Sequence, residues 1–464
     1  MANIIYGMFN VASTALLTQQ KALDVTANNI ANVNTEGYSR QRVNMEQNEP
    51  VRYQGGTLGT GVQANQYIQR VYDKFINAQL AESESLSGRW DAELETLEKA
   101  ELMFDETSGY GLNDALAQFW NSWQEVANNP SGYTERVTLI ADTQNLVNVI
   151  NSLSDGLSEV QSDSDKSIAA AVDQINTLTG EIAQLNLKIA EIEAGGHSAN
   201  EFNDARDMKL KELSGLIDIN GFEDADGYLT INTANGKPLV DRTHSWNLTT
   251  RDNTNDLQDV FWVDSSGGEE NITADIGTGK LKGWIEARDD SIAGYKTRLD
   301  ELAGAIIGEV NTWHAAGNTL DGTTGVDFFT GSDASDMAIN NAIASNPNLI
   351  AAALGSEAPP GGNGNAIEIA ELQNALTMST NTASFDDFYN ALAGDVGSKV
   401  ALARTNSDHQ SAVSLQLSTY REEISGVSLD EEMVALVQFQ SAYNAAAKLV
   451  TTVDEMLDSL IAMV

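Results

Sequence analysis

The chain has 464 residues, of which 42% are hydrophobic and 20% are charged, so it is long enough to bury several cores. Its 26 basic and 67 acidic side chains give a formal net charge of −41, which repels nucleic acid and anionic lipid, so we expect neither nucleic acid nor a membrane as a partner. Because the sequence has no cysteine, disulfides, thiolate metal sites and thiol nucleophiles are excluded.

The first predicted element is a helix near the amino end that packs along one seam. Its seam positions alternate spacings of four and three, which is the seven-residue repeat of a coiled-coil strand. These positions are Ile5, Phe9, Ala12, Leu16, Gln19, Leu23, Thr26, Ile30 and Val33. Because the segment lacks a basic n-region and polar residues interrupt its apolar ones, it is neither a cleavable signal peptide nor a membrane span.

A cluster of asparagines ends this helix in the stretch ANNIANVNTEGYSRQRV, residues 27–43. Asparagine tolerates helix capping and left-handed geometry, and glycine lets the chain turn. The predicted turn residues are Asn34, Thr35, Gly37 and Tyr38. Asn32 and Asn34, taken alone, are explained equally well as ordinary helix caps.

Asn28 and Asn29 lie before the predicted end of the helix, beside Ile30 on the seam. Amide side chains at a seam fix the register of packed helices, whereas apolar residues alone allow the helices to slide. We therefore predict that these two amides form hydrogen bonds between neighbouring subunits of an assembly.

Helix patterns continue through the middle of the chain on both sides of a region with a different period. Apolar residues recur at helical spacing within residues 90–104, 135–193 and 292–313. The second pattern is the longest, and Gly195 and Gly196 end it.

Residues 219–282 alternate with a period of two and contain the dipeptides Asp226-Gly227 and Asn235-Gly236. Both dipeptides are strong hairpin signals, so this interval predicts an antiparallel β domain inserted between helices.

Residues 321–365 are rich in glycine, asparagine and proline. This composition predicts surface loops, with one short helix near Met337.

A second seam helix forms the carboxyl end of the chain. Its seam positions are Leu429, Met433, Leu436, Gln440, Tyr443, Ala447, Val450, Asp454, Leu457, Ile461 and Val464. Neither terminal helix has an apolar partner nearby in sequence, so we expect the two to pair as a coiled coil. The alternative is that each docks separately on a globular core.

The predicted fold class is mainly α with an inserted antiparallel β domain, in an elongated molecule. Residues 1–70 with 425–464 form the terminal coiled coil and an extended arm. Residues 71–218 with 283–424 form a helical bundle that carries the β domain of residues 219–282.

No set of residues in the sequence predicts enzymatic chemistry. The four histidines are single, without partners at metal-ligand spacing. FEDADGY resembles half of a calcium loop, but Phe222 and Thr233 stand where carboxylates are needed, so a hairpin turn explains it better. IGTGKLKG lacks the spacing of a phosphate loop. We predict no enzyme, no cofactor and no metal site.

The two ends of the chain resemble a known family. LDVTANNIANVNTEGYSRQRV (residues 23–43) resembles the amino-terminal signature of bacterial flagellar rod, hook and hook-associated proteins. SLDEEMVALVQFQSAYNAAAKLVTTVDEMLDSL (residues 428–460) is similar to their carboxy-terminal signature. Inner stretches at residues 181–216 and 279–329 are similar to the hook-associated members at the junction of hook and filament.

The resemblance implies a structural subunit of the extracellular flagellum, exported by a type III apparatus without a cleaved signal peptide. The implied partners are further copies of the chain in a ring, the hook protein, a second junction protein, and an export chaperone on the carboxy-terminal helix. The predicted interface residues are Ile5, Phe9, Leu16, Leu23, Asn28, Asn29, Ile30, Asn32, Leu436, Tyr443, Val450, Leu457 and Ile461. The alternatives are another axial subunit of hook or rod, or a secreted coiled-coil adhesin.

Overall fold

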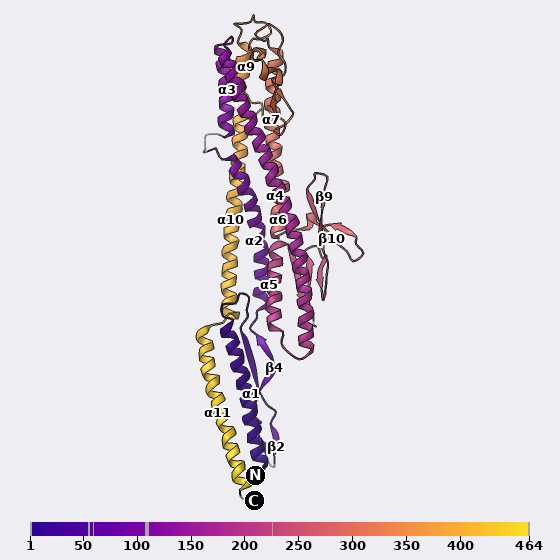
Figure 1. Ribbon diagram of the computed structural model, residues 1–464, viewed down its shortest axis with the longest axis vertical. Coiled ribbons are helices and arrows are strands. Elements are labelled where there is room, and N and C mark those ends of the chain that lie inside the picture. Colours follow the sequence, from indigo (N-terminus) through magenta and orange to yellow (C-terminus); the bar gives the residue numbers. More distant parts are fainter. Residues whose placement is uncertain (1, 54–55, 59, 107–110, 225, 463–464) are drawn as a thin grey trace.

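The computed structural model describes residues 2–53, 56–58, 60–106, 111–224 and 226–462. The molecule is elongated, and both ends of the chain lie together at one tip (Figure 1). Long helices dominate it and several small antiparallel sheets accompany them, so the predicted fold class is confirmed. The main helices are α1 (Ala2–Ala31), α2 (Lys74–Glu101), α3 (Leu112–Asn128), α4 (Tyr133–Ala194), α5 (Asn200–Leu216), α6 (Gly279–Glu286), α7 (Ala293–Ala316), α9 (Gly364–Glu371), α10 (Phe385–Ser425) and α11 (Leu429–Ile461).

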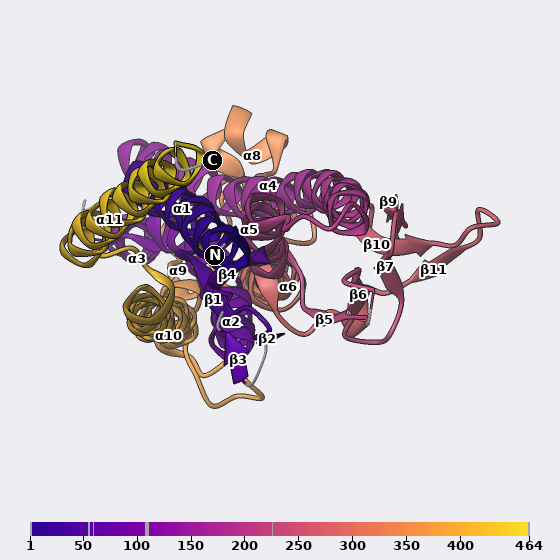
Figure 2. The same ribbon diagram turned by 90° about the horizontal axis from the view of Figure 1, so that it is seen from below.

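The first and last helices form an antiparallel pair at the tip that holds both chain ends. α1 and α11 lie side by side in both views (Figures 1 and 2). A ribbon of β1 (Gln41–Gln47) and β4 (Val62–Arg70) covers a second side of α1, and the short strands β2 (Val51–Tyr53) and β3 (Gly56–Leu58) form a hairpin between them. α1 is therefore packed on two sides, while α11 has α1 as its main neighbour.

The remaining long helices form a rod with two apolar cores. α4 is a single helix of 62 residues that takes part in both cores. It contributes residues between Leu139 and Val160 to the core farther from the chain ends, which we call the distal core, and residues between Ile168 and Ala183 to the second core. It ends at Gly195, and Gly196 follows with a φ of 76°, which glycine adopts without strain. The predicted end of the longest helix is confirmed.

The second core joins the rod to a β domain that projects sideways (Figure 1). Its four-stranded sheet has the order β5-β6-β7-β8 and its three-stranded sheet the order β11-β10-β9. Both predicted hairpins are present, because β5 pairs with β6 and β6 with β7, and Gly227 and Gly236 have φ values of 83° and 86°. The strands are β5 (Ile219–Glu223), β6 (Leu229–Thr233), β7 (Pro238–Asp241), β8 (His244–Ser245), β9 (Leu248–Asp252), β10 (Gln258–Val263) and β11 (Glu269–Asn271).

The chain enters and leaves the β domain at adjacent points. The Asp218 carboxylate accepts a hydrogen bond from the backbone N–H of Gly277 (2.8 Å). Gly279 has a φ of 84°, and a Cβ there would collide with the backbone of Leu216 and Ile217. The two connections therefore touch, and α6 begins directly after them, inside the interval that the sequence analysis assigned to strands.

The prediction of surface loops for residues 321–365 is confirmed for the exposed turns of this segment and wrong for its packed part. Phe328 and Ile350 are buried in the distal core, and the segment forms the short elements β12 (Phe329–Thr330), β13 (Ala338–Ile339) and α8 (Asn341–Ser345). The short helix predicted near Met337 lies a few residues later, because Met337 itself is buried against the core. Glycine and asparagine provide the tight turns of a packed segment here, so composition alone was misleading.

A buried histidine makes the distal core sensitive to acid. The Ala351 N–H donates to Nε2 of His314 (3.0 Å), so the opposite ring nitrogen carries the proton and donates to the Val326 carbonyl. Burial lowers the pKa of His314 to about 4. Between about pH 6.5 and 4 the unfolded chain binds a proton that the folded chain does not, so stability falls as the pH falls through this window.

We expect this histidine to reduce the free energy of unfolding by about 3 kcal/mol between pH 6.5 and pH 4. Urea titrations of wild type and of His314→Gln at several pH values measure the difference in slope. His197→Gln is the matched control, since the His197 side chain is exposed. Equal slopes for wild type and His314→Gln contradict the prediction.

Candidate assembly interface

The seam of α11 differs from the predicted one at alternate positions. Of the predicted seam, Leu436, Tyr443 and Val450 are half-buried against α1. The rest of the observed seam is a second line of buried and half-buried residues, each of which lies one position before a predicted seam residue. This line is Glu432, Phe439, Ala446 and Val453 at seven-residue spacing. Leu457 and Ile461 are exposed, and Val464 lies outside the described residues. A pattern of large apolar residues does not identify these positions, because a small alanine and a buried glutamate occupy part of the seam.

The seam of α1 follows the prediction more closely. Ile5 is buried and Leu16, Leu23 and Ile30 are half-buried, but Phe9 is 44% exposed. The unpredicted buried positions Ala22 and Val25 result from the second covered side of the helix.

Large apolar side chains remain exposed on both terminal helices. On α11 they gather in the first turns, where Met433, Val434 and Val437 are 59%, 69% and 59% exposed. On α1, Tyr6, Phe9 and Leu17 are exposed at helical spacing. We call these two sets the α11 patch and the α1 patch. Such patches rimmed by polar residues are typical of contact surfaces.

A polar cluster lies where the terminal pair meets the rod, and Asn29 is its centre. Asn29 is 1% exposed. Its amide nitrogen donates to the Gln41 carbonyl (2.8 Å) and to Oε2 of Glu432 (3.1 Å), and its amide oxygen accepts from the Tyr38 hydroxyl and the Gln41 N–H (both 2.9 Å). Every hydrogen-bonding group of this amide is thus used within one chain.

Glu432 is the second buried member of the cluster and comes from the first turn of α11. Its side chain is 3% exposed, and its Oε1 accepts from Nε of Arg40 (2.7 Å). Glu431, which is largely exposed, accepts from Nη1 of the same arginine (2.8 Å). Burial and the nearby carboxylates of Asp204, Glu201 and Glu432 raise the pKa of Tyr38, so its hydroxyl stays a donor. We call Asn29, Tyr38, Arg40, Gln41 and Glu432 the hub.

Helix α5 extends the hub into the rod. Asp204 accepts from the backbone N–H of Ser39 (3.0 Å) and from Nη1 of Arg70 (2.9 Å), and Asp207 accepts from the same nitrogen (2.7 Å). Burial raises the pKa of Asp207, whereas the charge of Arg70 opposes this rise. One cation is therefore shared by two carboxylates at the joint between the terminal pair and the rod.

The turn after α1 is held from two sides. Gly37 has a φ of 80°, and a Cβ at this position would collide with the Met208 side chain of α5. Its carbonyl accepts from Nη2 of Arg421 of α10 (3.0 Å). Asn34 and Thr35 are exposed on the outer side of this turn.

The structure changes the interpretation of the asparagines. Asn29 bonds within the chain, so the predicted cross-subunit hydrogen bond of Asn29 is wrong. Asn28 and Asn32 are half-buried and bond to each other, with Nδ2 of Asn32 donating to Oδ1 of Asn28 (2.9 Å). Sequence reasoning missed Arg40 and Glu432, because their partners lie about 400 residues away in the chain.

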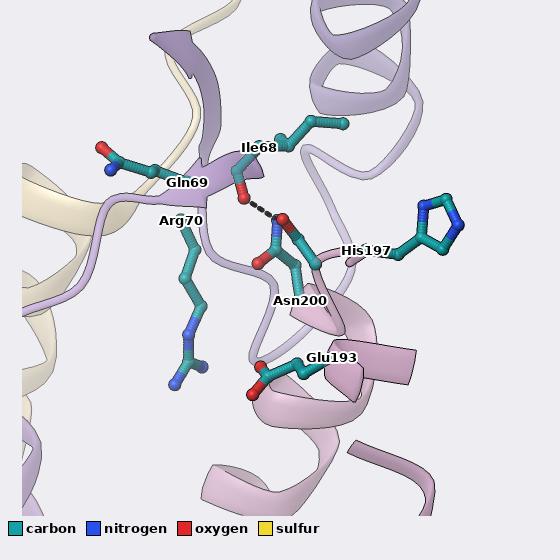
Figure 3. Close-up of a pocket in the computed structure, with 7 residues that line it drawn as sticks. Ile68, Gln69, Arg70, Glu193, His197 and Asn200 are labelled. Carbon is teal, nitrogen blue, oxygen red and sulfur yellow. Dashed lines mark hydrogen bonds between the residues drawn. The ribbon is translucent and has the colours of Figure 1, made fainter. Parts of the chain in front are cut away.

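An open groove lies beside the hub, between β4 and the turn from α4 to α5 (Figure 3). Asn200 bridges its walls by donating to the Ile68 carbonyl (2.9 Å). The side chain of His197 points away from Arg70, so the polar groups do not converge on one point (Figure 3). The hydrogen bond of Asn200 thus links β4 to the start of α5 beside this groove.

The described part of the chain has neither a metal-binding cluster nor a membrane-spanning helix. Among the residues that the structure describes, no group of three histidine or acidic side chains is placed to hold a metal ion. Within the same residues, no helix has both the length and the apolar character required to cross a membrane.

Family models match the chain at both ends and in the middle. Residues 97–329 match the model described as the flagellar hook-associated protein FlgK helical domain. Residues 9–38 match that of flagella basal body rod proteins, and residues 420–463 that of the carboxy-terminal region of flagellar basal body rod FlgEFG proteins.

The chain is similar over nearly its whole length to proteins named flagellar hook-associated protein 1. The chain is 30% identical to flagellar hook-associated protein 1 of Bacillus subtilis, over 97% of this chain and 96% of that one. It is 28% identical to flagellar hook-associated protein 1 of Escherichia coli, over 98% and 99%. The solved flagellar hook junction protein FlgK from Burkholderia pseudomallei has the same fold, with a TM-score of 0.68 at 14% identity, over 75% of this chain and all of that one.

An elongated subunit with paired terminal helices that match rod-protein models at both ends is a flagellar axial protein. The chain belongs to the family of flagellar hook-associated protein 1, whose members are structural components of the flagellum. Its place is therefore outside the cell, as part of the flagellum.

Proposed function

We propose that this protein forms a ring at the junction of hook and filament, in which the terminal pair of each subunit packs laterally against its neighbours. Residues 1–70 with 425–464 form the wall of a tube, and the rod and the β domain project outwards. The hook protein binds below the ring and a second junction protein binds above it.

The observation that carries this proposal is the pair of exposed apolar patches on a chain of charge −41. The α1 patch and the α11 patch consist of different residues on different helices, which suits a head-to-tail contact that closes into a ring. Each contact buries the α11 patch of one subunit on the neighbour, and the interface residues Phe9, Leu457 and Ile461 lose their exposure there.

The α11 patch also explains why the subunit needs a protein partner before it assembles. Met433, Val434 and Val437 are apolar and face water in the single subunit. We propose that an export chaperone covers this part of α11 in the cell, and that the chain then leaves through a type III apparatus without losing a signal peptide.

Deletion of the gene is expected to leave hooks without filaments, as seen by electron microscopy. A variant truncated after Ser428, which lacks α11, should not restore filaments. Filaments in the deletion strain contradict the proposed place at the junction and favour the adhesin alternative.

The α11 patch is tested more narrowly by Met433→Gln with Val437→Gln. We expect filament attachment to fall at least about tenfold, because each polar substitution removes more than 1 kcal/mol of apolar burial at every contact. Leu402→Gln is the matched control, since Leu402 is also 59% exposed but lies on α10 in the rod. Filament counts from the double variant that equal those of Leu402→Gln contradict the proposed contact.

A further inference from the structure

Three short connections meet at the joint between the terminal pair and the rod. They are residues 32–40 after α1, 71–73 before α2, and 426–428 before α11. The last two lead from one part to the other, and the first joins α1 to β1. Such connections at the ends of helices are the usual sites of hinges. The orientation of the terminal pair is therefore set by the side chains that surround the connections.

The turn after α1 makes hydrogen bonds to α5, α10 and α11. Ser39 bonds to α5 and the N–H of Arg40 donates to the Ser425 carbonyl at the end of α10 (2.8 Å). The Arg40 side chain bonds to α11, and Asn29 of α1 bonds to the same carboxylate of Glu432. A single turn thus contacts both terminal helices and two helices of the rod.

We infer that the hub is a lock that holds the terminal pair at one fixed orientation to the rod. The Glu432 carboxylate is its key member, because each of its oxygens accepts from a different partner while the side chain is 3% exposed. Arg40 stands in the turn that bonds to α5 through the Ser39 N–H and to α10 through its own N–H. If α11 rotates away from this turn, Glu432 loses its ion pair with Arg40 in a buried place, where an unpaired charge is costly.

The lock needs both ends of the chain. Asn29 comes from α1 and Glu432 from α11, so neither helix alone completes it. The orientation is consequently fixed only when α11 is docked on α1. This inference concerns one subunit and holds whether or not the proposed ring is correct.

The test is a distance distribution between two spin labels in the full-length purified chain, which has no native cysteine. Labels at Lys448→Cys on α11 and Leu415→Cys on α10 span the joint, and both sites are exposed. Glu432→Gln keeps the size of the side chain but places an NH₂ donor against Asn29 or Arg40. We expect it to broaden the distribution at least about twofold.

Two controls make the result specific. Glu431→Gln alters the exposed partner of the same Arg40 and should leave the width unchanged. Labels at Leu187→Cys and Leu415→Cys lie within the rod, so their distribution should stay narrow in every variant. The inference is overturned if Glu432→Gln keeps the wild-type width, if the wild-type width is already that of the variant, or if the rod pair broadens equally. Loss of filaments with an unchanged width would point to the ring contact instead of the lock.

Discussion

Replacing Asn29 with aspartate is expected to destabilise the packing of α11 on α1 by about 3–5 kcal/mol, because it puts a second buried carboxylate next to Glu432. The native amide donates to Glu432 Oε2 and to the Gln41 carbonyl, and a carboxylate donates to neither. Hydrogen exchange followed by mass spectrometry measures the effect as faster exchange in α1, the turn after it and the start of α11.

Asn28→Asp is the matched control for this variant. Its side chain uses its oxygen to accept from Asn32 Nδ2, and aspartate retains that acceptor. Combining Asn29→Asp with Glu432→Gln removes the clash of charges, so the double variant should exchange more slowly than Asn29→Asp alone. Unchanged exchange in Asn29→Asp, or no recovery in the double variant, contradicts the role given to Asn29.

The second large effect is expected at Arg136, a buried cation of the distal core. Arg136 is 1% exposed, and its guanidinium donates to the carbonyls of Pro130, Pro347 and Ile350, with distances between 2.6 and 3.2 Å. Arg136→Met fills similar space but leaves three carbonyls without this donor. We expect a loss of about 3–5 kcal/mol in the free energy of unfolding.

Urea unfolding followed by tryptophan fluorescence measures this loss, since Trp120 and Trp123 are buried in the same core. Arg404→Met serves as the control, because Arg404 is exposed and pairs with Glu98 at the surface. An exposed pair of this kind contributes at most about 1 kcal/mol. Similar midpoints for the two variants contradict the structural role of Arg136.

Patterns of neighbouring residues were sufficient to predict the long helix and the two hairpins. α4 follows an apolar stripe of helical period that glycine ends. The two hairpins follow from Asp-Gly and Asn-Gly, whose glycines take the positive φ that these turns require. The pairing of the chain ends followed from two stripes without other partners.

Long-range contacts were not predictable in the same way. The position of Glu432 on the buried side of α11 depends on Asn29 and Arg40 at the other end of the chain, and no local pattern marks a glutamate as buried. Likewise, Phe328 and Ile350 lie in a segment whose composition indicates loops, yet they fill the distal core. The hub is built from such pairings, which is why the sequence identified the motif but not its partners.

The way the β domain is attached has a consequence for how this protein can vary. Its two chain ends are joined at Asp218 and Gly277, and its inner residues share the second core with α4, so its outer loops can lengthen without moving α5 or α6. The entropy of closing such a loop changes slowly with its length. These outer loops are thus a place where evolution, or an engineer who fuses a cargo to the flagellar surface, can insert sequence while the second core keeps the sheets packed on α4.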